Sequence, residues 1–343
     1  MSVNKKYSKP LGNLNSLKKN FFENNDGMLQ MADGMADILL SQPPRNACKI
    51  CGSPLATPLY KSHGINYIEC QKCGHLNSEC EDTDDFASKV YVEDDYSKNY
   101  SAKDKDGYLN RMNMIYVPKA QYLSDCLASE GLSIGQINIL DIGAGCGYFV
   151  SAAHKLGMSA TGIEVSSHEV AYGNEMMDTP CLTCVGLTDS IDYIKSTDSN
   201  VISAIGVLEH LIHLDENLQA IKSNKNIQYL YASVPMFSFS SCFEAAFQDC
   251  YNRHTGGTHT HLFSNESIAH LADSIGFELC YEWRFGSDIN DLYRFMMVSM
   301  QKNGNEQLAS YFSDKFTPLM DDLQNVLDKS EFSSELHFIL KRK

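Results

Sequence analysis

A cluster of glycines between residues 139 and 149 is where residue types and spacing point most directly to chemistry. The stretch reads ILDIGAGCGYF, so an apolar segment runs into glycines at positions 143, 145 and 147. A second apolar segment, Ala160 to Val165, ends on Glu164. Glycine lets the backbone approach a ligand without a Cβ clash, and an acid at a strand tip can bind both hydroxyls of a ribose. The pattern therefore predicts a nucleotide-binding unit of strand, turn, helix and strand.

The spacing of the glycines narrows the choice of ligand. A dinucleotide fold needs G-x-G-x-x-G, but Tyr148 occupies the third glycine position and the glycine comes one residue earlier. The pattern from Asp141 to Gly147, D-x-G-x-G-x-G, resembles the first motif of class I S-adenosylmethionine-dependent methyltransferases. In that family the loop holds the methionine part of the cofactor. The alternative is a glycine-rich turn in another α/β protein, and Glu164 at the matching distance argues against it.

The resemblance continues in chain order beyond this loop. It implies a fourth strand at Val201 to Val207, a fifth at Gln228 to Val234, a sixth at Phe277 to Trp283 and a seventh at Glu335 to Leu340. The implied fold class is α/β, with a Rossmann-like methyltransferase sheet of seven strands in the order 3-2-1-4-5-7-6. By the same resemblance the cofactor-binding residues are Asp141, Gly143, Ala144, Gly145, Gly147, Glu164, Leu187, Gly206, Val207, Tyr108 and Arg111. Tyr108 and Arg111 are candidates for contacting the methionine carboxylate, and helix packing is an equal alternative for them.

Four cysteines in two pairs predict a metal site near the N-terminus. Cys48 and Cys51 form one CxxC pair, Cys70 and Cys73 form another, and eighteen residues separate the pairs. Four thiolates at this spacing can occupy the tetrahedral positions around Zn²⁺. Because all four ligands are cysteines, no coordination position stays open for catalysis. We therefore expect a structural zinc ribbon rather than a pair of redox motifs.

Three histidines are candidates for acid–base chemistry. His210 follows the fourth strand directly after Glu209, whereas His259 and His261 belong to the segment TGGTHTHLFS after the fifth strand. Methyl transfer to a hydroxyl or a carbon acid requires an aligned acceptor and the removal of a proton. A histidine with a pKa near neutrality suits that role. We therefore predict that His210, His259 or His261 is the general base, with a hydrogen-bonded structural role as the alternative for each. Arg253, in the same region, could hold a phosphate or carboxylate of the acceptor.

The combination of ribbon and histidine-rich segment resembles zinc-ribbon methyltransferases that act on sugars in antibiotic and surface-polysaccharide pathways. That resemblance implies a small polar acceptor, a sugar or a nucleotide-linked sugar. Those enzymes carry a further C-terminal domain, whereas only an insert and the last strand follow Trp283 here, which favours O-methylation over C-methylation. The family's Asp/Asn-Pro-Pro-Tyr/Phe signature for base or glutamine amines is replaced by GVLEH at 206–210, which argues against N-methylation of that kind.

The predicted organisation has four parts. Residues 1–45 are an N-terminal extension, 46–78 the zinc ribbon, 79–130 an acidic linker with cofactor-covering helices, and 131–343 the methyltransferase domain with a helical insert at 288–331. The insert is expected to pack, to cover the substrate or to join two subunits, so a homodimer is possible.

Composition limits the partners. The net charge of −15 disfavours nucleic acid, because affinity for phosphate backbones comes from Lys and Arg. No run reaches the ~20 apolar residues that a bilayer requires, so no membrane is expected. Twelve cysteines without a secretory signal favour a reducing, cytoplasmic location. Two other functions stay open: an RNA or protein methyltransferase whose ribbon binds the macromolecule, and a non-catalytic cofactor-binding scaffold.

Overall fold

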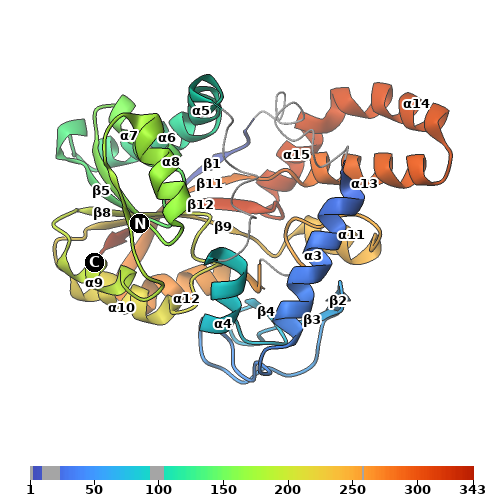
Figure 1. The fold of residues 1–343 in the computed structure, drawn as a ribbon, viewed down its shortest axis with the longest axis horizontal. Coiled ribbons are helices and arrows are strands. Elements are labelled where there is room, and N and C mark those ends of the chain that lie inside the picture. Colours follow the sequence, from blue (N-terminus) through green and yellow to red (C-terminus); the bar gives the residue numbers. More distant parts are fainter. Residues whose placement is uncertain (1–2, 10–23, 93–103, 257–258) are drawn as a thin grey trace.

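An eight-stranded sheet forms the centre of the molecule (Figure 1). The computed structural model describes residues 3–9, 24–92, 104–256 and 259–343, so parts of the predicted extension and linker lie outside the described residues. The sheet order is β1-β11-β12-β9-β8-β5-β6-β7. The strands are β1 Asn4–Tyr7, β5 Asn138–Ile142, β6 Ser159–Glu164, β7 Leu182–Cys184, β8 Val201–Ile205, β9 Tyr229–Pro235, β11 Phe277–Phe285 and β12 Glu335–Arg342.

The prediction of a seven-stranded sheet was wrong by one strand. From β7 to β11 the strands follow the predicted order, and β12 runs antiparallel to both neighbours. The additional strand, β1, pairs in parallel with β11, beginning with Asn4 opposite Tyr281. Its sequence, NKKY, is short and polar, so no alternating pattern marked it as a strand. The N-terminal extension thus contributes a strand to the central sheet.

Helices cover both faces of this sheet, which explains why its central strands are almost entirely buried. On one face lie α6 Val117–Ser129, α7 Tyr148–Lys155 and α8 Ser167–Met177, and on the other α9 Ser190–Ser196, α10 Leu214–Ser223 and α12 Asn265–Ile275 (Figure 1). Every residue of β9 is buried, as expected for a strand enclosed on both sides. Each helix turns an apolar stripe inward; α10, for example, buries Leu214, Leu218 and Ile221 at helical spacing.

A second sheet belongs to the cysteine-rich module. It contains β2 Tyr60–Ser62, β3 Ile65–Glu69 and β4 Leu76–Ser78, extended by β10 His261–Leu262 in the order β10-β4-β3-β2. In the chain, β10 lies between β9 and β11, two strands of the large sheet. The next residue, Phe263, accepts a hydrogen bond from Phe237 N (2.8 Å) and donates one to Pro235 O (3.0 Å) at the end of β9. Residues 261–263 are therefore hydrogen-bonded to both sheets and join them through the backbone.

The remaining helices surround these two sheets. They are α3 Asn25–Leu40, α4 Asp84–Ala87, α5 Lys105–Arg111, α11 Phe239–Ala246 and the short segments η1 Ser88–Val92, η3 Met112–Tyr116, η4 Ile134–Gln136 and η5 Thr317–Leu319. Helix α3 packs its buried Met35 and Leu39 against the ribbon residues Ile65 and Tyr67. Between β11 and β12, α13 Asp288–Lys302, α14 Glu306–Phe316 and α15 Met320–Lys329 form an arm that extends away from the sheet (Figure 1). Within the described ranges, no helix is both long and apolar enough to cross a bilayer.

Candidate active site

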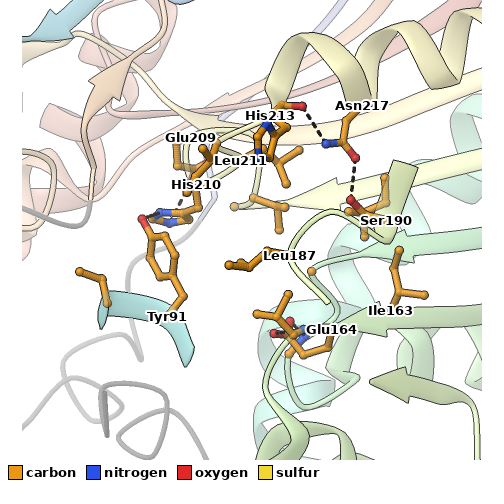
Figure 2. A pocket seen from close by; sticks show the side chains of 18 of the residues that line it. Tyr91, Ile163, Glu164, Leu187, Ser190, Glu209, His210, Leu211, His213 and Asn217 are labelled. Atoms are coloured by element: carbon orange, nitrogen blue, oxygen red, sulfur yellow. Dashed lines mark hydrogen bonds and ion pairs between the residues drawn. The ribbon is translucent and has the colours of Figure 1, made fainter. Parts of the chain in front are cut away.

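A cavity of about 470 Å³ opens at the carboxyl ends of β5, β6 and β8 (Figure 2). Open α/β sheets bind ligands at this edge. Its lining is Asp84, Val90, Tyr91, Ile142, Gly143, Gly145, Ile163, Glu164, Val165, Glu169, Val185, Leu187, Ser190, Gly206, Val207, Glu209, His210, Leu211, Ile212, His213, Asn217, Tyr251, Arg253 and His259. Asp84, Val90 and Tyr91 follow the ribbon in sequence, so the ribbon side of the molecule supplies one wall of the cavity.

The glycine loop, residues 143–147, lies at the base of this cavity. Different contacts explain why each of its glycines has no side chain. Gly143 has φ +62°, and a Cβ there would lie 2.8 Å from Val207 Cγ2. The loop and the end of β8 therefore touch, and Gly143, Gly145 and Val207 all face the cavity. Gly147 precedes α7 with φ +71°, and a Cβ there would meet Met177 and Leu182 instead. Gly147 lines neither cavity described here, and close packing against α8 and β7 is itself a reason for a glycine at this position.

Glu164 ends β6 at the cavity wall, as the sequence predicted. Its Oε2 accepts from Gly145 N (2.9 Å), and its Oε1 accepts from Val165 N (2.7 Å) and Ser166 N (3.0 Å). A carboxylate can accept about four hydrogen bonds. These hydrogen bonds fix the position of the carboxylate. A ribose diol that binds Glu164 must share the carboxylate oxygens with the Gly145 amide.

A smaller cavity of about 130 Å³ lies on the other side of the glycine loop. Arg111, Asp141, Ala144 and Glu169 are among its lining residues. Ser203 Oγ donates to Asp141 Oδ1 (2.6 Å), yet burial raises the pKa of the Asp141 carboxyl to about 7. Burial also raises the pKa of the Glu169 carboxyl to about 7, with Glu164 adding to the effect. A guanidinium beside two carboxyl groups can hold the carboxylate and ammonium of an amino acid.

Tyr108 supports the loop from behind. Its side chain is fully buried, its ring lies 4.5 Å from that of Tyr148, and its hydroxyl donates to Cys146 O (3.2 Å). Among the described residues, Tyr108 lines neither of these two cavities, whereas its predicted companion Arg111 lines the smaller one.

The far end of the large cavity gathers polar side chains around His210. The Tyr91 hydroxyl lies 3.0 Å from His210 Nδ1, and Glu209 Oε1 lies 3.9 Å from His210 Nε2 (Figure 2). The rings of His210 and His259 are 5.0 Å apart. Burial raises the pKa of the Glu209 carboxyl to about 8. Two of the three predicted histidines are therefore neighbours at one site.

The ring of His259 is oriented by the backbone. Its Nδ1 lies 3.2 Å from His254 O, and since a carbonyl only accepts, Nδ1 carries the proton and Nε2 the lone pair. Burial holds the pKa of His259 well below its usual range, and the neighbouring His210 lowers it further. His259 is thus neutral near pH 7 with one nitrogen able to accept a proton or bind a cation.

His261 is not part of this site, so the prediction that it faces the acceptor was wrong. It is fully buried in β10, where its Nδ1 lies 2.9 Å from His75 Nε2 and its ring packs on Phe263. Residues 259 and 261 would face the same way only if both belonged to one extended segment. The strand begins only at His261, and its pairing with β4 turns this side chain into the contact between ribbon and catalytic domain.

A buried carboxylate fixes the loop that carries the acceptor-side residues. Glu244 of α11 accepts from the backbone N–H groups of Arg253 (2.9 Å), His254 (3.1 Å) and Thr255 (3.1 Å). Arg253 faces the cavity, and its Nη1 lies 2.7 Å from Asp291 Oδ2. An anionic acceptor would therefore compete with Asp291 for this guanidinium.

Sequence reasoning missed several cavity residues. Glu169 stands in the first turn of the helix after Glu164, a position that can be recognised in the sequence. Ser190 and Asn217 face the nucleoside end and bond to each other at 2.9 Å. Tyr91 carried no local signal, because only the docking of the ribbon against the catalytic domain places it beside His210.

The four paired cysteines converge, as their spacing predicted. Their Sγ atoms all lie within 4.8 Å of one another, with Cys48–Cys73 at 3.6 Å and Cys51–Cys70 at 3.5 Å. A tetrahedral ion with metal–sulfur bonds of about 2.3 Å needs sulfur separations of about 3.8 Å. Gly52 N and Gly74 N each donate to the first cysteine carbonyl of their pair (2.8 Å). The geometry therefore fits a tetrahedral metal site.

Part of the chain matches a known protein family. Residues 109–282 match a family model described as a methyltransferase domain. The similar solved structures include magnesium protoporphyrin IX methyltransferase from Synechocystis PCC 6803 with bound S-adenosylhomocysteine. That structure has 10% identity, covers 72% of this chain and 93% of its own, and gives a TM-score of 0.46. Another is a methyltransferase from Archaeoglobus fulgidus, with 16% identity, 65% and 94% coverage and a TM-score of 0.40. No curated protein sequence matches the chain.

The family match spans just over half of the chain and contains the glycine loop, Glu164, His210 and His259. The protein therefore belongs to the methyltransferase-domain family and is an S-adenosylmethionine-dependent methyltransferase.

Proposed function

We propose that the protein transfers a methyl group to a hydroxyl of a small polar acceptor, a sugar or nucleotide-linked sugar. The observation that supports this most is that one cavity contains the glycine loop with Glu164 at one end and Tyr91, His210 and His259 at the other. The sugar class rests on the likeness of the ribbon and the histidine segment to sugar methyltransferases.

The cofactor residues divide between the two cavities. Glu164 takes the ribose hydroxyls and Leu187 packs on the adenine, while Arg111 and Asp141 hold the amino-acid end. When bound, the cofactor supplies an electrophilic methyl group on a sulfonium sulfur. Gly143, Ala144, Gly145, Gly206 and Val207 shape the passage between these ends.

The acceptor end aligns a hydroxyl and removes its proton. The acceptor oxygen forms a bond to the methyl carbon, and the carbon–sulfur bond breaks with its electron pair left on sulfur. The hydroxyl proton passes to Nε2 of His259 or His210. Glu244 supports this step indirectly, because it fixes the loop from which His259 extends.

The ribbon gives little support to a macromolecular acceptor. Two of its basic residues, Arg45 and Lys49, have side chains that are only 2% and 7% exposed, and both pair with Asp82. They stabilise the contact with Thr260, whose hydroxyl donates to Asp82 Oδ2 (3.2 Å). A surface that binds nucleic acid needs exposed cations, and these two are not exposed.

The experiment that tests the proposed function is a thermal-shift screen of sugar nucleotides with S-adenosylhomocysteine present. Ligands that raise the melting temperature are then incubated with the sulfonium cofactor, and methylated product is sought by mass spectrometry. Methylation of one hydroxyl of a sugar nucleotide is the expected result. Methylation of RNA or protein alone, with no sugar nucleotide bound, would overturn the acceptor class.

We also propose that the four cysteines bind a structural zinc ion. Purified protein is expected to contain at least one tightly held zinc per chain, and Cys70→Ser to lose it, because three thiolates leave the tetrahedral site incomplete. Elemental analysis measures the zinc, and Cys242→Ser, an exposed cysteine outside the cluster, is the control. Less than half an equivalent of metal with all four thiols freely titratable would contradict the proposal.

Cofactor affinity is expected to rise with pH through about 7. The free protein holds Asp141 with a pKa of about 7, and the ammonium group of the ligand favours the ionised carboxylate, so binding lowers this pKa. Affinity therefore rises by up to about tenfold per pH unit below 7 and levels off above it. Calorimetry with S-adenosylhomocysteine between about pH 5.5 and about pH 8 measures this. Asp141→Asn should flatten the slope, and a slope unchanged in this variant would contradict the assignment.

A further inference from the structure

Glu209, His210 and His259 form a compact set of ligating groups inside the large cavity. Each offers one ligand atom, and these atoms lie within 4.8 Å of one another. Glu209 and His210 follow β8, whereas His259 comes from the segment before β10, so tertiary structure alone brings them together. In the described part of the chain, the only other such set of three or more is the four-cysteine cluster.

The outward ring nitrogens of both histidines are already held. His259 Nδ1 donates to His254 O (3.2 Å), and His210 Nδ1 lies 3.0 Å from the Tyr91 hydroxyl. Histidines that bind metals usually donate the second ring N–H to a carbonyl or a similar oxygen, which fixes the tautomer and the ring plane. In both rings Nε2 is then the nitrogen that faces the cluster.

Glu209 supplies a carboxylate that the described residues do not satisfy. Its side chain is 4% exposed, and its Oε2 is buried without a hydrogen-bond partner among the described residues. Its Oε1 lies 3.9 Å from His210 Nε2, beyond hydrogen-bond distance. A buried carboxylate oxygen without a partner is costly, and a cation beside it would offset that cost.

We propose that Glu209, His210 and His259 bind a divalent transition-metal ion, separate from the four-cysteine site, that receives the acceptor. Two imidazoles and one carboxylate are ligands typical of zinc, iron, cobalt or manganese, whereas Mg²⁺ and Ca²⁺ prefer oxygen ligands alone. Three protein ligands leave positions open on such an ion. Metal–ligand bonds of about 2.1 Å require the Glu209 and His210 atoms to approach by about 1 Å, which side-chain rotation can provide.

This inference rests on the proposed function and specifies its acceptor. A bound ion lowers the pKa of an attached hydroxyl, as it does for water, so the proton leaves to solvent. The two histidines are then ligands, and this route replaces the proton transfer to His259 or His210 described above. The deprotonated oxygen then takes the methyl carbon, and the sulfur keeps the electron pair of the broken bond. An acceptor with two adjacent oxygens, such as the vicinal diol of a sugar, can occupy two open positions.

The test titrates full-length protein that holds a single zinc equivalent per chain, in the four-cysteine site, with Mn²⁺ alone and follows free Mn²⁺ by electron paramagnetic resonance. Manganese is the probe because thiolates favour softer ions, so it leaves the cysteine site undisturbed. We expect one Mn²⁺ per chain, with affinity reduced at least 10- to 100-fold in Glu209→Gln and His259→Ala, since even changes beside a ligand cost about that much. Glu216→Gln and His168→Ala, exposed residues outside the cluster, are matched controls that should bind normally.

Thermal melting and S-adenosylhomocysteine affinity establish that each variant is folded. Loss of Mn²⁺ binding in both cluster variants, with the cofactor site intact, supports the inference. No Mn²⁺ binding by the wild type, or equal binding by the variants, overturns it. If the protein binds Mn²⁺ at the cluster but methylates no sugar, the metal site is supported and the proposed acceptor is contradicted. If the protein methylates a sugar at full rate after chelation, with the zinc of the four-cysteine site retained, the acceptor is supported and the second metal site is contradicted.

Discussion

His259→Ala is expected to lower turnover by about 10²- to 10⁴-fold, the usual contribution of a positioned acid–base group. The reason is geometric: the His254 carbonyl holds Nδ1–H, so Nε2 is the nitrogen presented to the acceptor, or to the ion that receives the acceptor. Affinity for S-adenosylhomocysteine should stay within a factor of about three, because the effect belongs to the chemical step. Steady-state turnover with the identified acceptor, together with calorimetry, provides both measurements.

His168→Ala is the matched control, since this histidine is exposed on α8 and does not line the cavity. His210→Ala should behave like His259→Ala, because the two rings belong to one cluster. If both cluster variants keep turnover within a factor of about three of the wild type, no proton transfer depends on this cluster. Catalysis would then rest on proximity and alignment alone.

Glu164→Ala is expected to weaken S-adenosylhomocysteine binding by roughly 10- to 150-fold. The change removes charge-assisted hydrogen bonds to the ribose, which contribute about 1.5–3 kcal/mol. It also frees the Gly145 amide that Glu164 accepts from, so part of the loss comes from a looser glycine loop. Isothermal titration calorimetry of the purified variant measures the sum of both effects.

A ligand that lacks the ribose 2′-hydroxyl separates these two effects. The wild type should bind the 2′-deoxy analogue more weakly than S-adenosylhomocysteine. Glu164→Ala should bind the two ligands equally well, because it lacks the carboxylate that accepts from the 2′-hydroxyl. Glu175→Ala, an exposed acid on α8, should bind as the wild type does. If Glu164→Ala still discriminates between the two ligands as strongly as the wild type, the ribose is bound elsewhere.

Local chemistry was predictable from the sequence, whereas long-range pairing was not. Gly143 and the cysteine pairs could be identified because positive φ angles and ligand spacing are encoded within a few residues. Glu164 could be identified because a strand tip at a fixed distance from the loop has one position in this fold. These features depend on covalent geometry and short segments, which the linear sequence contains.

Other features depend on surfaces that meet only in three dimensions. Strand β1 forms because the edge of β11 is open to pairing. The sequence NKKY has no alternating pattern that would predict a strand. His261 looked like a partner of His259, but its pairing with β4 decides its direction. Tyr91 reaches His210 only because the ribbon docks against the catalytic domain. Arg45 and Lys49 both pair with Asp82, a contact between separate segments that the sequence does not show.

The segment 261–263, hydrogen-bonded to both sheets, makes the ribbon and the catalytic domain one unit of assembly. Removing the ribbon would leave β10 with an unpaired edge, and exposed edges invite pairing with other chains. It would also remove the residues against which Tyr91 packs and the pairing of the strand that follows His259. The ribbon is therefore not a module that can be exchanged alone between enzymes. A chimera would have to transfer β4, β10 and the cavity-lining segment 84–91 together.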